Sequence, residues 1–273
     1  MKLLDLFSGI GGFHLGLKQS RFKFDWVGFS EIDKYASKQY KRRFANAEEL
    51  GNITLVQPKK LPTDITILCG GFPCQAFSIT GKRQGFNDTR GTLFFEIARI
   101  LRYFKDIGKP IPYFVLENVK GLLNHDNGRT FATIYGILSN LDYTIECQLL
   151  NTKWWLPQNR ERIYIVGHLG KPGRSKIFPI GENDERNREI EFSRETTSEE
   201  EWYMQNLEDR WRYSLHSSEV LRRLTPIECE RLQGFPDGWT KGQSDTQRYK
   251  QLGNAVSVPV VKAVGDKIIK LIN

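Results

Sequence analysis

The sequence has 273 residues, of which 39% are hydrophobic and 12% aromatic, enough for one large domain or a large domain with a smaller one attached. No apolar run approaches membrane-spanning length, and the N-terminal stretch lacks a signal-peptide cleavage site, so we expect a cytoplasmic protein without membrane contact. The four cysteines and four histidines show no metal-ligand spacing, which predicts reduced thiols and no bound metal. The net charge of +8 favours a polyanionic partner, although a solvated basic surface would give the same balance.

Short apolar strands alternate with helical stretches over the first two-thirds of the chain. Strands are predicted at 3–7, 24–30, 65–70, 113–118, 143–150 and 162–167, with helices at 13–20, 33–44, 92–104 and 129–139. This alternation predicts a mainly parallel α/β sheet covered on both faces. Residues 181–201 are charged and poor in apolar side chains, so we expect them to be exposed. A final helix at about 256–272 has apolar residues at period 3.6 and should pack back on the sheet.

A glycine-rich turn, DLFSGIGG (5–12), follows the first predicted strand. Glycines at such a position let a ligand approach the backbone and leave N–H groups free to bind it. Glu31 ends the second strand about twenty residues later, where an acidic side chain commonly binds a ribose diol. The turn and Glu31 together predict a site for an adenosine-containing cofactor; a tight turn made only for packing is the alternative.

Cys74 lies just past the strand at 65–70, at the edge of the sheet where open α/β folds bind their ligands. It follows Pro73 in a polar, cationic loop that can favour a thiolate, whereas Cys69 lies inside the apolar strand. On these residues alone, a nucleophile and an ordinary loop thiol are equally open.

Two further strands end in polar side chains. Glu117 and Asn118 stand at the end of an apolar strand, where burial would favour a protonated carboxyl; a helix-capping carboxylate is the alternative. Arg160 and Arg162 are in period-2 register at the start of the last strand, so both should point to one face. Two cations there suit a phosphate or a polar base edge, and ion pairing at the start of the strand is the simpler alternative.

Six segments resemble, in the same order, the blocks that characterise the DNA cytosine-C5 methyltransferases, which use S-adenosylmethionine. They are DLFSGIGG (5–12), GGFPCQAFS (70–78), ENVKGLL (117–123), QNRERIYIVG (158–167), RRLTPIECERLQGFPDGW (222–239) and QLGNAVSVPVV (251–261). The resemblance implies a Rossmann-like methyltransferase fold with a second, smaller domain. It implies a catalytic and cofactor-binding domain at 1–168 plus 251–273, a target-recognition domain at 169–250, and duplex DNA between them.

The resemblance also implies the chemistry. Carbon 5 of cytosine is too electron-poor to accept a methyl group directly, so the family adds a cysteine thiolate to C6 first. Cys74 would be this thiolate, and Glu117 would hold or share a proton at the ring N3. Arg162 would bind the base O2, and Arg160 would stabilise its neighbourhood. Because the target base must leave the duplex, base flipping is expected as well.

Ten residues match cofactor-binding positions of the family, and five match or flank DNA-binding ones. The cofactor set is Phe7, Gly9 and Gly11 at the methionine end with Gly12 in the same turn, Glu31 at the ribose, Ile32 on the adenine, and Asn52, Leu93, Asn254 and Val256 around them. Asn52 departs from the aspartate that the family often has, but its amide oxygen can accept the same hydrogen bond. The DNA set lies in the basic loop 78–91 and comprises Ser78, Lys82, Arg83, Gln84 and Arg90.

The region that selects the target sequence in this family has only about 55 residues here and is largely charged. Three alternatives for target recognition are open: a minimal domain that suffices alone, a second subunit that supplies recognition, or relaxed specificity. Without a second subunit we expect a monomer. A tRNA cytosine-C5 methyltransferase is the nearest alternative, but those enzymes usually have a Pro-Pro-Cys segment where this chain has Phe-Pro-Cys. A non-catalytic nucleic-acid-binding module and a nicotinamide dehydrogenase explain fewer of the segments. From the family we expect a bacterial or phage-encoded protein with a restriction-modification role, as opposed to an orphan or phage role.

Overall fold

The structure is a computed structural model that describes residues 1–73, 93–170, 176–181, 213–215 and 221–272. Its centre is a seven-stranded sheet in the order β3-β2-β1-β4-β5-β7-β6. The strands are β1 (Lys2–Leu6), β2 (Trp26–Ser30), β3 (Glu48–Glu49), β4 (Ile67–Gly71), β5 (Tyr113–Val119), β6 (Thr144–Asn151) and β7 (Glu161–His168). The first five strands in the sheet order from β3 to β5 are parallel, and β7 runs antiparallel to both β5 and β6. The predicted Rossmann-like sheet is therefore confirmed.

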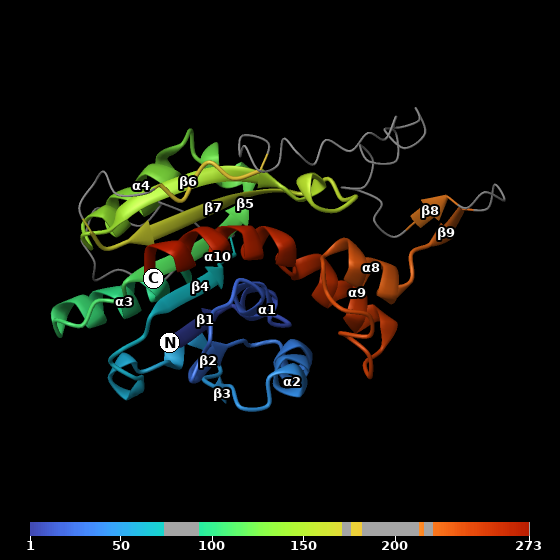
Figure 1. The fold of residues 1–273 in the computed structure, drawn as a ribbon, viewed down its shortest axis with the longest axis horizontal. Coiled ribbons are helices and arrows are strands. Elements are labelled where there is room, and N and C mark those ends of the chain that lie inside the picture. The colour runs from blue at the N-terminus through green and yellow to red at the C-terminus, as the bar shows by residue number, and fades with distance from the viewer. Residues whose placement is uncertain (74–92, 171–175, 182–212, 216–220, 273) are drawn as a thin grey trace.

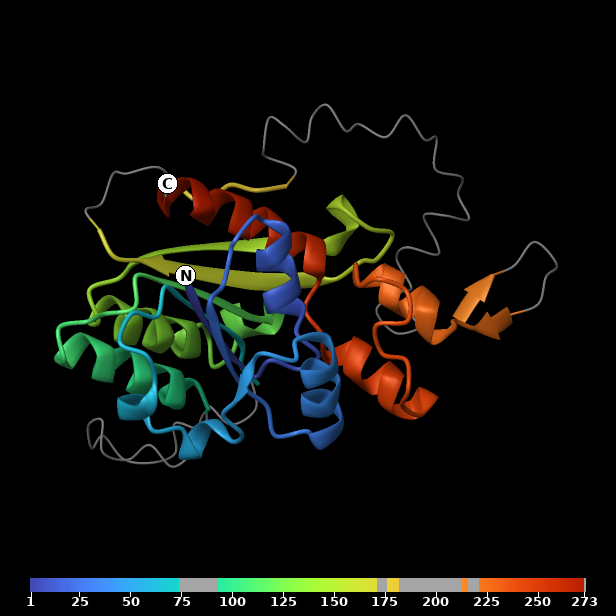
Figure 2. The same ribbon diagram turned by 60° about the horizontal axis from the view of Figure 1, so that its bottom comes forward.

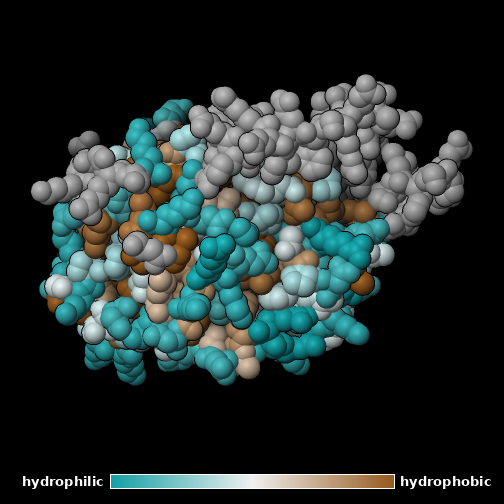
Figure 3. Space-filling model, viewed as in Figure 1, coloured by the Kyte–Doolittle hydropathy of each residue, from teal (hydrophilic) through white to brown (hydrophobic). Residues whose placement is uncertain are grey.

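Helices cover both faces of the sheet (Figures 1 and 2). On one face α3 (Leu93–Asp106) and α4 (Arg129–Ser139) pack against the sheet in a core that contains Phe94, Leu101 and Ile134. On the other face α1 (Gly12–Gln19), α2 (Lys34–Arg43) and α10 (Val258–Ile272) form a second core. On the face seen in Figure 3, hydrophilic side chains predominate and apolar ones surface in small areas between them. Among the described helices, none combines the length and the apolar content needed to cross a bilayer.

The N-terminal and C-terminal helices α1 and α10 pack closely because a glycine faces a valine. A Cβ atom on Gly16 would lie 2.6 Å from Val261 Cγ1 and 3.0 Å from the carbonyl oxygen of Val258. This contact joins the two ends of the chain across the same face of the sheet, as predicted for the last helix.

We expect Gly16→Ala to lower the free energy of unfolding by about 1–3 kcal/mol, because the added methyl group must push α10 away from α1. Gly136→Ala is the matched control, since a Cβ at this helical position in α4 would meet nothing within 4 Å. The control should gain about 0.5–1 kcal/mol from the lower entropy of its unfolded chain. Urea unfolding of both variants measures the difference, and equal effects would contradict the close packing of α1 on α10.

Several elements were not predicted from the sequence. They are the short strand β3, the 3₁₀ turns η1 (Ile53–Leu55), η2 (Pro58–Lys60), η3 (Lys120–Leu123) and η4 (Thr152–Trp154), the hairpin β8 (Tyr213–Leu215) and β9 (Leu221–Arg223), and the helices α8 (Pro226–Leu232) and α9 (Asp245–Asn254). Helix α8 begins with a capping box, in which the Thr225 hydroxyl accepts the Glu228 N–H and the Glu228 carboxylate accepts the Thr225 N–H. This pattern is a sequence signal for a helix start.

Two parts of the predicted target-recognition domain, residues 176–180 and the segment from Leu224 to α9, pack against the sheet and its helices. Leu224, Cys229 and Trp239 share a third core with Ile10 and Ala36 from the N-terminal segment, and Figure 2 shows α9 beside α2. Residues 176–180 lie along β6, where the Gln148 side chain both accepts the Ile180 N–H and donates to its carbonyl. The division of the chain at 168 and 250 stays a prediction.

Candidate active site

The candidate site lies where β4 and β5 end, at the carboxyl edge of the parallel strands. Gly71 of β4 and Glu117 of β5 are neighbours in register. A Cβ atom on Gly71 would lie 3.1 Å from Glu117 Oε2, so the carboxyl packs directly on the backbone three residues before Cys74. Cys74 itself and the predicted DNA contacts lie outside the described residues; those contacts are Ser78, Lys82, Arg83, Gln84 and Arg90.

Asn118 fixes the direction in which the chain leaves β4. Its side-chain Nδ2 donates to the carbonyl of Phe72 at 2.9 Å, and its Oδ1 accepts the N–H of Val119 at 2.8 Å. The side chain is buried, and the bond to the Phe72 carbonyl is shielded from water. Asn118 thus connects β5 to the segment that leads to Cys74. The sequence analysis placed Asn118 beside Glu117 but assigned it no role.

Glu117 is a buried carboxyl, with 8% of the residue exposed. Its Oε1 lies 3.2 Å from Nε of Arg162 on β7, yet that atom accepts no hydrogen bond from any described residue. Burial raises the pKa of Glu117, and the nearby cations Arg160 and Arg162 lower it by less, so the pKa stands above its ordinary value. A carboxyl in this setting is suited to holding a proton.

Arg160 and Arg162 differ in what they bind. The guanidinium of Arg160 donates to the carbonyls of Gly253 at 3.3 Å and Ala255 at 2.9 Å, which fixes the link between α9 and α10. Burial lowers the pKa of Arg160, and the adjacent Arg162 lowers it further. Arg162 lies beside Glu117 and donates to the carbonyl of Glu161 at 2.8 Å. Arg162 is therefore the cation at the carboxyl, while Arg160 holds the backbone beside it.

The glycine turn and the end of β2 are joined by the carboxylate of Glu31. Its Oε2 accepts the N–H of Gly9 and its Oε1 accepts the N–H of Asp33, both at 2.8 Å. Gly9 and Gly11 have φ angles of +53° and +87°, a conformation that side chains rarely adopt. A Cβ atom on Gly9 would meet nothing within 4 Å, so the turn borders open space. These features suit a ligand with a polar ribose-like part against a backbone turn.

Of the other predicted cofactor residues, Phe7 and Val256 lie at this turn, and Leu93 and Asn254 lie at helix ends. Phe7 also has a positive φ of 52°, and Val256 Cγ2 would lie 2.7 Å from a Cβ on Gly12, which brings the last segment onto the turn. Asn254 is exposed at the end of α9, and Leu93 is half-buried at the start of α3.

Two apolar side chains are left largely in solvent after β2 and β3. Ile32 and Leu55 are each 74% exposed, which is unusual for large aliphatic residues and suits a flat apolar ligand surface. Leu55 was not predicted as a cofactor residue. It is the last residue of η1, a turn that Asn52 caps by accepting the N–H of Thr54 at 3.1 Å. The sequence indicates a role for Leu55 only by its position, two residues after Ile53. No group of three or more acidic, histidine or cysteine side chains suited to a metal is found within the described ranges.

Comparison with known protein families identifies the family of this chain. Residues 1–212 and 177–270 match the C-5 cytosine-specific DNA methylase family. The chain belongs to this family. The methylase is 40% identical to the type II methyltransferase M1.ScrFI of Lactococcus lactis subsp. cremoris, over 99% of this chain and 78% of that relative. It is 37% identical to the type II methyltransferase M.HpaII of Haemophilus parainfluenzae, over 98% of this chain and 88% of the relative.

Solved structures agree on the fold. The methylase superposes on the crystal structure of the Schizosaccharomyces pombe (S. pombe) Dnmt2 methyltransferase with a TM-score of 0.74, covering 100% of this chain and 99% of that one. The sequence identity is 21%, so this likeness concerns the fold alone. The family predicted from the six segments, its Rossmann-like fold and the enzyme class, an S-adenosylmethionine-dependent DNA (cytosine-5-)-methyltransferase, are confirmed. The roles assigned to single residues stay predictions.

Proposed function

We propose that this methylase transfers a methyl group from S-adenosylmethionine to C5 of a cytosine flipped out of duplex DNA, through a covalent bond between Cys74 and C6. The observation that carries the proposal is Glu117, a buried carboxyl with a raised pKa that packs on Gly71 and faces Arg162. Two of the described cysteines support Cys74 as the nucleophile, because burial raises the pKa of Cys69 and that of Cys229, the latter to about 12. The third, Cys147, lies on the edge strand β6.

The proposed reaction balances in three steps. The Cys74 thiolate forms a bond to C6, the C5–C6 π electrons move to C5, and the proton of Glu117 neutralises the charge at N3. Arg162 holds the base O2, which keeps the ring in the plane that this attack requires. Carbon 5 would then gain the methyl group, and N3 would return its proton to Glu117. Loss of the C5 proton to water would restore the C5–C6 double bond as the C6–sulfur bond breaks and Cys74 leaves as a thiolate.

The residues around the glycine turn fit the cofactor. Its ribose hydroxyls would compete for the Glu31 carboxylate that now accepts the N–H groups of Gly9 and Asp33. Ile32 and Leu55 present exposed apolar surface suited to an adenine ring, and the open space at Gly9 accommodates the amino-acid end. When bound, S-adenosylmethionine supplies an electrophilic methyl group on a sulfonium and is left as S-adenosylhomocysteine.

DNA would be held by the basic loop 78–91 and by the region between β7 and α8. Lys82, Arg83 and Arg90 would contact phosphates, Ser78 the backbone, and Gln84 the space left by the flipped base. The alignment with M1.ScrFI spans 315 positions, more than the 273 residues of this chain, so that relative has additional residues. The region between β7 and α8 would read a short site, alone or with a second subunit. The type II relatives support a place in a restriction-modification system.

A base-resolution map of 5-methylcytosine tests the proposal. Plasmid DNA is prepared from a methylation-free bacterial host that expresses the wild-type chain or Cys74→Ser. We expect methylation at one short motif with the wild type and none with the variant. Scattered methylation would mean intact chemistry with relaxed recognition. The absence of methylation by a folded, cofactor-binding protein would overturn the proposal as it stands, and methylation of tRNA by the same protein would replace it with the RNA alternative.

A further inference from the structure

A tryptophan from the C-terminal part of the chain is bonded to the glycine turn. The indole Nε1 of Trp239 donates to the carbonyl of Ile10 at 3.0 Å, although the two residues are 229 positions apart in the sequence. Both residues are buried, and both belong to the third core. Because Ile10 stands between Gly9 and Gly11, this hydrogen bond is made in the middle of the turn.

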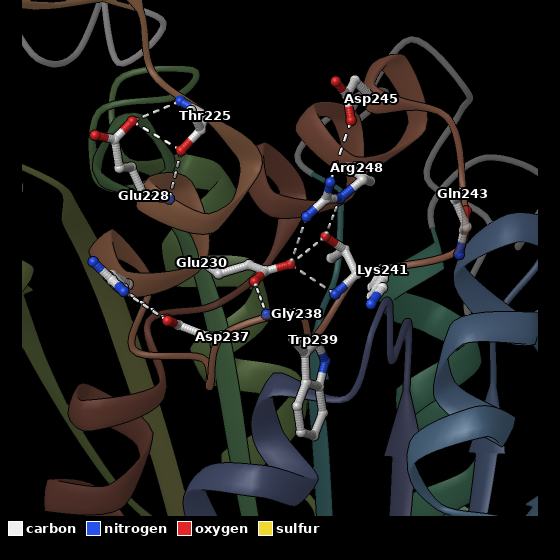
Figure 4. A network of polar contacts seen from close by, with 12 residues as sticks. Thr225, Glu228, Glu230, Asp237, Gly238, Trp239, Lys241, Gln243, Asp245 and Arg248 are labelled. Atoms are coloured by element: carbon white, nitrogen blue, oxygen red, sulfur yellow. Dashed lines mark hydrogen bonds and ion pairs between the residues drawn. The ribbon is translucent and has the colours of Figure 1, made fainter.

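The loop that bears Trp239 is held from inside by one carboxylate, that of Glu230 on α8. Glu230 is fully buried, and it accepts the N–H of Gly238 at 2.5 Å and the N–H of Thr240 at 2.8 Å. These are the residues on either side of Trp239. Figure 4 shows Glu230 between α8 and this loop, with Arg248 of α9 on its far side at 3.4 Å. The carboxylate therefore fixes the backbone on both sides of the indole.

The outer side of the same loop is bonded to α2, the helix that begins after Glu31. Nε of Arg43 donates to the Trp239 carbonyl at 2.8 Å, and the Gln39 side chain donates to the same oxygen. The Arg43 guanidinium also lies over the Trp239 ring, 4.9 Å from its centroid. The loop thus contacts both segments that Glu31 joins, the glycine turn and α2.

We infer that Trp239 and Glu230 are positioning residues of the cofactor site, acting through the Ile10 carbonyl without contact with the cofactor. The inference rests on the proposed function, which places S-adenosylmethionine at the glycine turn. Glycines adopt positive and negative φ angles with similar ease, so Gly9 and Gly11 do not fix the turn by themselves. A buried hydrogen bond to the residue between them fixes it before the ligand arrives, which removes an entropic cost from binding.

The test compares two tryptophan-to-phenylalanine variants. Trp239→Phe keeps an aromatic ring in the core and removes the N–H that holds Ile10. Trp26→Phe is the matched control: the Trp26 indole donates to Glu48 at 2.9 Å, but at the start of β2, the opposite end of the strand from Glu31. Affinity for S-adenosylhomocysteine is measured by calorimetry, and affinity for the DNA duplex by titration. The thermal midpoint of every variant shows whether it is folded.

We expect Trp239→Phe to bind S-adenosylhomocysteine roughly tenfold more weakly, because one buried carbonyl in the turn loses its donor. The KM for S-adenosylmethionine should rise by a similar factor, while kcat at saturation and duplex affinity stay unchanged. Trp26→Phe should bind the cofactor as the wild type does. Glu230→Gln should weaken cofactor binding at least as much, because the amide NH2 would face one of the two backbone N–H donors and could not accept from it.

The outcomes separate the inference from the function on which it rests. A wild-type protein that does not bind S-adenosylhomocysteine would overturn the proposed cofactor site, and the inference with it. A wild type that binds, together with a folded Trp239→Phe that binds equally well, would overturn the inference alone. Equal weakening in Trp239→Phe and Trp26→Phe would also overturn it, since the effect would then be general destabilisation.

Discussion

Cys74→Ser should abolish methyl transfer, lowering the single-turnover rate by about four orders of magnitude or more. A serine hydroxyl is not ionised at neutral pH, so it cannot add to C6 as a thiolate does. The rate is measured with radiolabelled S-adenosylmethionine and a duplex that contains the mapped site. Cofactor affinity should remain, because the glycine turn and Glu31 are untouched by the substitution.

A duplex with 5-fluorocytosine at the target position separates covalent from non-covalent catalysis. Fluorine cannot leave C5 as a cation, so the C6–sulfur bond should persist and the complex should survive denaturation. We expect this complex with the wild type and with Cys147→Ser, and none with Cys74→Ser. Cys147 is the matched control because it is the exposed cysteine among those described, on the edge strand β6. A trapped complex with Cys74→Ser would rule out Cys74 as the nucleophile.

Glu117→Gln should lower the methylation rate by about 10²–10⁴-fold, because an amide can donate a hydrogen bond to N3 but cannot transfer a proton. The pKa of Glu117 is raised by burial, so the wild-type rate should fall as rising pH removes this proton. The variant should lack that alkaline decline and retain the acidic decline that protonation of Cys74 causes. Single-turnover rates measured from acid to alkaline pH give both limbs.

Glu117→Gln should lower the methylation rate but raise the stability of the folded protein at alkaline pH. A carboxyl whose folded pKa exceeds its unfolded value costs stability when it ionises, so the cost is absent below the unfolded pKa and grows as pH rises through the folded one. Glu117→Gln should therefore unfold at higher urea than the wild type at alkaline pH and not at acid pH.

Glu161→Gln is the control for Glu117→Gln, since Glu161 makes a more exposed ion pair with Lys120 at 2.8 Å. It should change rate and stability little, because exposed ion pairs contribute little. A Glu117→Gln enzyme with the wild-type rate would show that N3 is protonated by another group.

Much of the site was visible in the sequence because the carboxyl ends of parallel strands meet at one edge. The helix predicted at 129–139 is α4 with the same bounds, and the predicted strands match β1, β2, β4, β5, β6 and β7 to within about two residues. Glu31 at the end of β2 and Glu117 near the end of β5 were found by this rule, and the structure places Glu31 at Gly9 and Glu117 at Gly71. Periodicity and position along a strand are local properties, so they can be read without coordinates.

Only the tertiary structure decided which distant segments complete the site. Helix α9 has a mixed polar surface with little apolar periodicity, so its sequence gave no signal; it is stabilised by contacts such as Tyr249 with the Leu224 carbonyl. The sequence predicts that Arg160 stabilises the neighbourhood of the base, but it does not reveal that the guanidinium binds the carbonyls of Gly253 and Ala255. Likewise, nothing local to Trp239 indicates that its indole reaches Ile10. Hydrogen bonds to backbone carbonyls depend on how the chain packs and not on the identity of the accepting residue, so the sequence alone does not reveal them.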